Sequence, residues 1–253
     1  SLSPPLLPQA TKALSLVACG SNGGDKDGDV IKIGIFEPTS GQNGPGGKKE
    51  ILGIEYAHSL KPTVTIGGKE YQIQLVTADN ASEASEAPAA AQTLISAGVS
   101  VVIGTYGSGC AIAAGDLFKS TKIPALGTSC TNPQVTQGND YYFRVCFIDP
   151  FQGTVMAQFA ARDLKAKTAV MYIDSSSDYS KSLGKVFQET FEAAGGKVVM
   201  QESFLAKDQD FKAALTKIKA ANADVIFIPA YYEEVGKIVK QAREIGITAT
   251  MLG

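Results

Sequence analysis

The sequence contains no tryptophan, a single histidine and almost no excess of either charge. Because His58 is the one imidazole, a histidine-dependent catalytic pair would rest on it alone. Its place in a predicted amphipathic helix indicates packing instead. The formal net charge of −2 shows no excess of the basic residues that nucleic-acid binding requires. No apolar run reaches the roughly 18 residues that a membrane span needs. We therefore expect neither histidine catalysis nor a nucleic-acid partner.

Cysteines are also few, and three of the four, Cys110, Cys130 and Cys146, lie in the part of the chain that is predicted to fold. Their spacing matches no zinc pattern, and a single histidine cannot complete one, so we predict no metal and no cofactor. Cys110 and Cys130 both fall next to predicted strand ends, which is compatible with a disulfide between them. Free buried thiols that pack as small apolar side chains are the alternative.

Residues 1–29 differ in kind from the rest of the chain. The run LSLVACG ends in the small residues and the cysteine of a bacterial lipoprotein cleavage site, in which Cys19 carries the lipid. The following NGGDKDGD reads as a flexible tether. A chance Ala-Cys-Gly is the alternative, because three prolines interrupt the upstream segment. We predict a lipoprotein signal remnant and a tether, and hence a lipid-anchored protein in the periplasm or at the cell surface.

From Val30 onward, short apolar runs alternate with helical patterns. Strands are predicted at 31–35, 71–77, 99–103, 123–126, 142–147, 168–173, 198–204, 224–229 and 247–252. Amphipathic or Ala-rich helices are predicted between most of them. Such alternation predicts an α/β fold with parallel sheets that are covered on both faces.

The alternation restarts near Asp149 and Pro150. Because proline disfavours the helical conformation in the preceding residue, we expect the chain to be extended at Asp149 and to begin a second unit there. The predicted organisation is an N-terminal lobe over residues 30–148 and a C-terminal lobe over residues 149–253.

Two polar segments follow predicted buried strands, Gly104–Cys110 (GTYGSGC) and Gly127–Tyr141 (GTSCTNPQVTQGNDY). Ligands of open α/β sheets bind at the carboxyl ends of the strands, where these segments would lie. Hydroxyl and free N–H groups in such a place suit a small charged ligand. Ser108 opens a predicted helix, whose N-terminus favours an anion. The alternatives are two ordinary loops and a plain N-cap serine.

Together with residues 143–153 (FRVCFIDPFQG), these segments resemble the periplasmic leucine/isoleucine/valine-binding proteins of ABC importers. The similarity runs from about residue 30 to the last residue. It implies the type I periplasmic-binding fold, in which two Rossmann-like lobes with parallel sheets are joined by a hinge. The family's chains are longer, so the resemblance also implies that the C-terminal part is missing.

The resemblance implies a ligand site between the lobes. Ser108 would bind the ligand carboxylate, and Ser129 and Thr131 would bind the α-ammonium by a backbone carbonyl and a hydroxyl. Tyr179 and Tyr231 would fold over the ligand when the cleft closes. The family's acidic partner of the ammonium would lie beyond residue 253.

The loop Ser40–Gly47 (SGQNGPGG) departs from the family, which carries an aromatic residue at the position of Gly46. We expect this glycine to enlarge the side-chain pocket, which puts the branched-chain preference in doubt. The loop fits neither a dinucleotide nor a P-loop spacing.

The implied function is that of an extracytoplasmic solute-binding protein rather than an enzyme. Its partners would be an amino acid, the membrane subunits of an ABC permease and, through the lipid anchor, the membrane surface. A ligand-sensing receptor domain is the first alternative. An α/β enzyme that uses a nucleotide or a sugar is the second, and the predicted cleft offers it no catalytic histidine or metal cluster.

Overall fold

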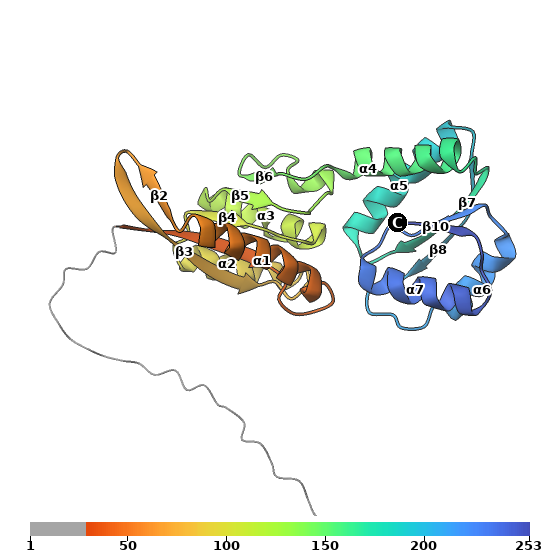
Figure 1. Cartoon of the computed structure of the whole chain (residues 1–253), viewed down its shortest axis with the longest axis horizontal. Coiled ribbons are helices and arrows are strands. Elements are labelled where there is room, and N and C mark those ends of the chain that lie inside the picture. Colours follow the sequence, from red (N-terminus) through yellow and green to blue (C-terminus); the bar gives the residue numbers. More distant parts are fainter. Residues whose placement is uncertain (1–28) are drawn as a thin grey trace, which may run out of the picture.

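The computed structural model describes residues 29–253, and its strands form two separate sheets (Figure 1). Cys19 and its predicted lipid lie outside the described residues. The first sheet and its helices form one lobe and the second sheet and its helices form the other. The chain passes once from the first to the second, between β6 and α4 (Figure 1). The two-lobe α/β architecture predicted from the sequence is confirmed.

The first sheet has the strand order β2-β3-β1-β4-β5-β6. Its strands are β1 (Val30–Glu37), β2 (Thr63–Ile66), β3 (Lys69–Asp79), β4 (Val101–Ile103), β5 (Ala125–Gly127) and β6 (Tyr142–Arg144). Its helices are α1 (Gly44–Leu60), α2 (Ala87–Ser96) and α3 (Ser108–Thr121), and a short 3-10 turn spans Pro133–Val135. Because the strands from β3 to β6 are parallel, their carboxyl ends share one edge of the sheet.

The expectation of purely parallel sheets was wrong at one edge. β2 pairs antiparallel with β3 in a hairpin. The turn is formed by Gly67 and Gly68, whose φ values of 58° and 82° are those that glycine adopts without strain. This strand was not predicted from the sequence, because the four residues of β2 are too few to show a strand pattern of their own.

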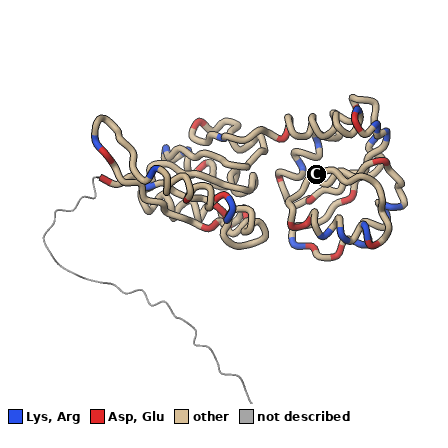
Figure 2. The backbone as a smooth tube through the Cα atoms, in the orientation of Figure 1, with Lys and Arg blue, Asp and Glu red and all other residues tan. Residues whose placement is uncertain are grey.

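The second sheet is wholly parallel, with the order β10-β9-β7-β8. Its strands are β7 (Thr168–Asp174), β8 (Lys197–Phe204), β9 (Val225–Phe227) and β10 (Thr250–Leu252). Its helices are α4 (Asp149–Gln158), continued by a π-helical turn (Phe159–Asp163), α5 (Asp178–Ala193), α6 (Lys212–Ala221) and α7 (Tyr232–Glu244). The charged residues of α6 are all lysines, whereas acidic and basic residues intermix along α7 (Figure 2).

The start of α4 differs from the expectation. Asp149 is the first helical residue, and the extended residue is Ile148, with φ −117° and ψ 156°. Pro150 lies in the first turn, where backbone N–H groups have no intrahelical partner, so its missing N–H costs no hydrogen bond.

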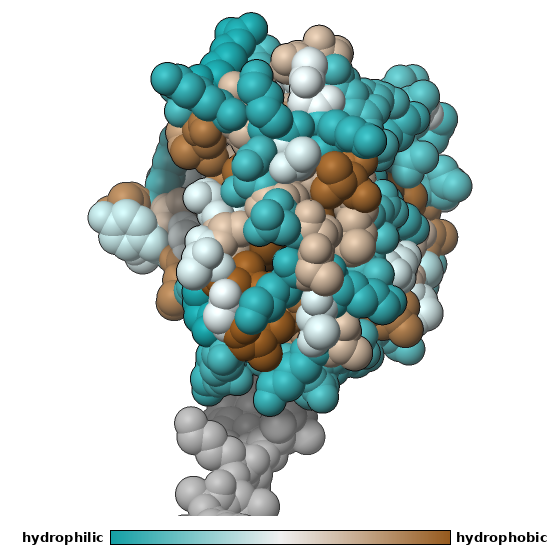
Figure 3. All heavy atoms as spheres, turned by 90° about the vertical axis from the view of Figure 1, so that its right-hand side faces the viewer, coloured by the Kyte–Doolittle hydropathy of each residue, from teal (hydrophilic) through white to brown (hydrophobic). Residues whose placement is uncertain are grey.

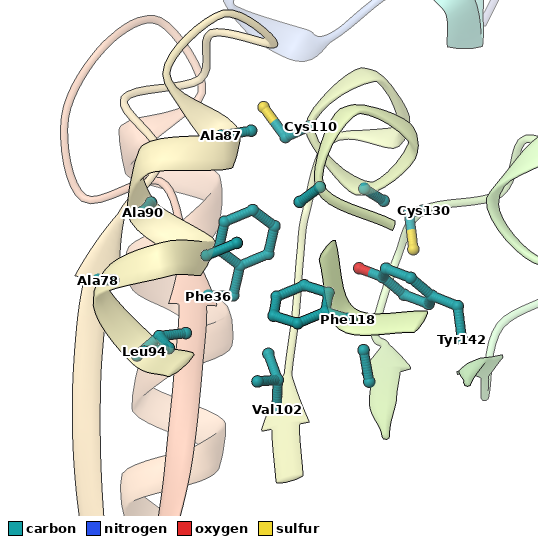
Figure 4. Packing of buried hydrophobic residues seen from close by; sticks show 14 of the residues in the cluster. Phe36, Ala78, Ala87, Ala90, Leu94, Val102, Cys110, Phe118, Cys130 and Tyr142 are labelled. Atoms are coloured by element: carbon teal, nitrogen blue, oxygen red, sulfur yellow. The ribbon is translucent and has the colours of Figure 1, made fainter. Parts of the chain in front are cut away.

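The first lobe buries one face of its sheet under α2 and α3. Phe36, Leu94 and Phe118 meet there (Figure 4), and the rings of Phe36 and Phe118 pack edge to face with centroids 5.6 Å apart. Full burial of each such side chain contributes about 1.5–3 kcal/mol to folding. The other face is less well covered, because a cavity of about 450 Å³ remains between α1 and the sheet.

The second lobe buries both faces of its sheet. On the side of α4 and α5, Phe187 stacks on Phe227 with ring centroids 4.1 Å apart. On the side of α6 and α7, Tyr172 packs with Leu215 and Ile238. The outer end of this lobe is largely hydrophilic, with scattered hydrophobic residues (Figure 3).

The cysteines of the described chain are free thiols, so the disulfide alternative for Cys110 and Cys130 is not realised. Both side chains are buried, and burial raises the pKa of each thiol to about 12. Cys146 is half-buried. Since the thiolate is the reactive form, the two buried thiols should be inert.

We expect a thiol reagent at pH 8 to modify Cys146 first in the native protein and to leave Cys110 and Cys130 largely unreacted. When the protein is unfolded in the absence of reductant, both thiols should react with the reagent. Peptide mapping by mass spectrometry measures each site separately. A peptide pair joined through Cys110 and Cys130 would contradict the free-thiol assignment.

Candidate functional site

The carboxyl ends of the two sheets face each other, and their loops enclose a cavity of about 420 Å³. Residues from both lobes line it: Tyr106, Thr128, Ser129, Thr131, Cys146, Phe147, Gln152, Tyr179, Ala230, Tyr231 and Tyr232. Four of the five predicted ligand residues, Ser129, Thr131, Tyr179 and Tyr231, are therefore among the lining residues of one interlobe cavity.

Three tyrosine rings close one wall of this cavity. Tyr231, which precedes α7, stacks on Tyr179 of α5 with ring centroids 5.2 Å apart. Its other side meets Tyr106, from the loop after β4 in the first lobe, at 5.4 Å. Tyr231 thus joins the two lobes, because one neighbouring ring comes from each.

Ser108 is the first residue of α3 and is 1% exposed. Its hydroxyl oxygen accepts a hydrogen bond from the backbone N–H of Asn132 at 3.2 Å. It lies behind Tyr231 rather than in the cavity lining. Burial raises the pKa of the Tyr231 phenol and the Ser108 backbone N–H acts to lower it, so this hydroxyl faces the free amide end of α3.

The segment from Ser129 to Thr136 is fixed by Arg144 of β6. The guanidinium donates to the carbonyls of Cys130, Asn132 and Pro133 at 3.1, 2.8 and 3.2 Å, and to the Thr136 hydroxyl at 2.6 Å. Five N–H donors in a rigid fork suit such a clamp. Arg144 therefore sets the conformation of the segment that carries Ser129 and Thr131.

Thr131 is 6% exposed, and its hydroxyl has no hydrogen-bond partner within the described chain. Its carbonyl accepts from the backbone N–H of Asp149, at the start of α4, at 3.0 Å. Next to it, the Asn132 amide donates to the carbonyl of Asp178 in α5 at 3.0 Å. Burial raises the pKa of the Asp149 carboxyl and the nearby Thr131 hydroxyl acts to lower it, so this hydroxyl can serve either Asp149 or a ligand in the cavity.

Two carboxyl groups lie beneath the cavity, and sequence reasoning missed both. Glu37 ends β1 and is fully buried, and it accepts from the backbone N–H of Tyr106 at 2.8 Å. Glu50 of α1 accepts from the hydroxyls of Thr128 and Ser129. Burial, followed by the neighbouring Glu50, raises the pKa of Glu37 to about 10. The sequence feature that could have pointed to Glu37 is a glutamate at the end of a largely apolar strand.

The expectation that Gly46 enlarges the pocket was wrong. A Cβ at Gly46 would lie 2.7 Å from Cζ of Tyr106, so the tyrosine ring already fills the space above this glycine. The aromatic residue that the loop Ser40–Gly47 lacks is supplied by the loop after β4. The Tyr106 ring can pack here because Gly46 has no side chain.

A second cavity, of about 450 Å³, lies on the other side of Tyr231. Its lining is more acidic, with Glu83, Asp174 and Asp178, and Lys207 of the second lobe pairs with Glu83 of the first. Of the predicted ligand residues it contains only Tyr231. The cavity on the side of Thr131 is therefore the better candidate for a zwitterion.

His58 lies on α1, where its Nε2 is 3.0 Å from the carbonyl of Ile73. Within residues 29–253 no three His, Cys, Asp or Glu side chains gather as metal ligands do. No helix among the same residues is both long and apolar enough to cross a bilayer.

The family model described as periplasmic binding protein matches residues 30–253. An amino acid binding protein of Pseudomonas aeruginosa is 32% identical over 227 residues, which cover 88% of this chain and 60% of that protein. This chain thus spans about 60% of the length of the curated relatives it matches.

Solved structures agree with this similarity. A leucine binding protein of Thermotoga maritima superimposes with a TM-score of 0.83 at 38% identity, over 87% of this chain and 62% of that one. The branched-chain amino acid transporter substrate binding protein of Streptococcus pneumoniae, solved with isoleucine, gives 0.80 at 38% identity, over 88% and 63%.

The packing of Tyr106 on Gly46 predicts an energetic coupling. Gly46→Ala should destabilise the protein by about 1–3 kcal/mol, because the ring is displaced. In the double variant, Gly46→Ala with Tyr106→Leu, the loss in free energy of unfolding should be smaller than the sum of the two single losses by about 0.5 kcal/mol or more. Denaturant unfolding measures all three variants.

The matched control is Gly53→Ala, in the same helix, where no atom lies within 4 Å of an added Cβ. It should stabilise by about 0.5–1 kcal/mol through helix propensity. Strict additivity at Gly46 and Tyr106 would show that the ring does not depend on the glycine.

Proposed function

Because the chain belongs to the periplasmic binding protein family, we propose that it is the solute-binding component of an ABC importer and that it holds an amino acid, branched-chain or of similar size, between its lobes. The observation that supports this most is the cavity beside α3. Its lining combines the Thr131 hydroxyl with two tyrosines from the opposite lobe, and the N-terminus of α3 lies behind one of them, Tyr231. These are the groups that a small zwitterion with an apolar side chain requires.

In the proposed complex the ligand carboxylate takes the place of the Tyr231 hydroxyl at the N-terminus of α3. There it accepts hydrogen bonds from the Ser108 hydroxyl and from free amides, which the helix dipole reinforces. The ammonium donates to the Ser129 carbonyl and the Thr131 hydroxyl. Hydrogen bonds to charged groups contribute about 1.5–3 kcal/mol each, so these contacts fix the orientation of the ligand.

The side chain of the ligand lies against the tyrosines. Tyr106 and Tyr179, which pack on Tyr231, offer ring surface that covers an aliphatic group. The Tyr179 hydroxyl lies 3.5 Å from Nε2 of Gln152, which places a polar group beside the rings. Relatives named for amino acid binding and the isoleucine complex of the Streptococcus pneumoniae protein support this ligand class.

Ligand contacts on both sides of the cleft favour the closed arrangement, because a ligand shifts an equilibrium by its difference in affinity for the two states. We place the hinge at residues 146–150, between lobes 30–148 and 149–253. The permease of the importer would recognise the closed form. In this proposal the protein acts outside the cytoplasm, attached through a lipid on Cys19, and carries out no covalent chemistry.

Replacing Ser108 or Thr131 with alanine should weaken amino acid binding by about 1.5–3 kcal/mol each, since each change removes a hydrogen bond to a charged ligand group. Isothermal titration calorimetry of the gene product with leucine, isoleucine, valine and alanine measures the effect.

Ser120→Ala is the matched control, because Ser120 lies exposed on the same helix and its hydroxyl donates only to the Leu117 carbonyl. Its affinity should equal that of the unmodified protein. Unchanged affinity in both Ser108→Ala and Thr131→Ala would place the ligand elsewhere.

A further inference from the structure

Glu37 and Glu50 come from different elements and meet beneath the floor of the cavity. Glu37 ends β1, and Glu50 lies in the second turn of α1. The Thr128 hydroxyl lies between them, at 3.3 Å from Oε1 of Glu37 and in contact with Oε2 of Glu50. The Ser129 hydroxyl reaches Oε1 of Glu50. The pair therefore touches two residues that line the proposed ligand site.

Within the described part of the chain these two carboxyl groups form no ion pair, although His58 and Lys61 line the same cavity as Glu50. The titratable groups that interact with Glu37 are Glu50 of α1, Cys110 of α3 and Tyr142 of β6, and none of them is basic. Glu37 is fully buried and Glu50 is half-buried, and burial together with the neighbouring Glu50 raises the pKa of Glu37, so a proton stays with the pair at neutral pH.

We propose that Glu37 and Glu50 share one proton and act as a singly charged positioning pair for the ligand ammonium, through Thr128 and Ser129. This inference rests on the proposed amino acid site. The protonated Glu37 keeps its bond from the Tyr106 N–H. The pair thus adds a negative charge from the first lobe to whatever groups bind the ammonium from the second.

Each contact of the pair has a consequence at the site. The bond to the Tyr106 N–H fixes the loop that carries the tyrosine ring. The bond from the Ser129 hydroxyl fixes the residue whose carbonyl would accept from the ammonium. The remaining negative charge of the pair lies one hydrogen bond behind Ser129 and is partly shielded from solvent, so it attracts a cation more strongly than it would in bulk water.

The shared proton also makes stability depend on pH. The carboxyl of Glu37 has a pKa of about 10 in the folded state, against 4.5 as its ordinary value. Between these values the unfolded chain releases a proton that the native chain keeps. Stability therefore falls as pH rises through this window. A glutamine at this position has no proton to lose.

Glu37→Gln tests the shared proton. The amide mimics a protonated acid, because its oxygen can accept from the Tyr106 N–H and its NH₂ can donate to Glu50. We expect the Tm of this variant to exceed that of the unmodified protein by a gap that widens from pH 5 to pH 9. A gap that does not change with pH would overturn the shared proton.

Glu37→Gln with Glu50→Gln tests the charge, since this double variant keeps hydrogen-bonding groups at both positions and loses the negative charge. Relative to Glu37→Gln alone, it should bind leucine about tenfold more weakly or worse. 2-Hydroxy-4-methylpentanoate, in which a neutral hydroxyl replaces the ammonium, should change by less than about threefold. Equal weakening of both ligands would show a purely structural role and overturn the proposal.

Glu55→Gln is the matched control, because this exposed glutamate lies on the same helix beyond Glu50. It should change neither the pH dependence of the Tm nor the preference for leucine over its hydroxy analogue. If the unmodified protein binds no amino acid at all, the proposed function fails. The Tm series then still decides whether the pair shares a proton.

Discussion

Tyr231 packs between Tyr179 of its own lobe and Tyr106 of the other, and the candidate cavity lies where these rings bring both sets of loops together. The position of Tyr106 in turn requires Gly46, whose missing side chain leaves room for the ring. The backbone N–H of Tyr106 is fixed by Glu37. The aromatic wall of the site is thus tied to a glycine and to a buried acid in the first lobe.

The polar part of the site is organised by buried groups that do not line the cavity. Arg144 orders the carbonyls of the segment that holds Ser129 and Thr131, and Glu50 orders the hydroxyls of Thr128 and Ser129. The Arg144 guanidinium thus orients backbone carbonyls of this segment, and the Glu50 carboxyl orients the two hydroxyls. Preorganised hydrogen bonds of this kind reduce the ordering cost of binding a small charged ligand.

The sequence predicted the parts of this structure that depend on local pattern. Alternating apolar and amphipathic runs predicted both sheets, and the polar loops after β4 and β5 pointed to residues that line one cavity. The Glu37 contacts were not predictable in this way, because they join residues 69 and 91 positions apart. The filling of the space above Gly46 was missed for the same reason, since it is a tertiary contact between two loops. The hairpin of β2 was missed because a four-residue strand has too little pattern.

Hydrogen–deuterium exchange of the gene product, with and without a saturating amino acid, tests the central claim of a ligand held between both lobes. The account predicts slower exchange of the backbone amides at 107–110 and 129–132, together with those at 176–180 and 231–234. Amides at the exposed outer ends of both lobes should be unaffected. Slowing confined to one lobe, or binding with no change at the N-terminus of α3, would contradict it.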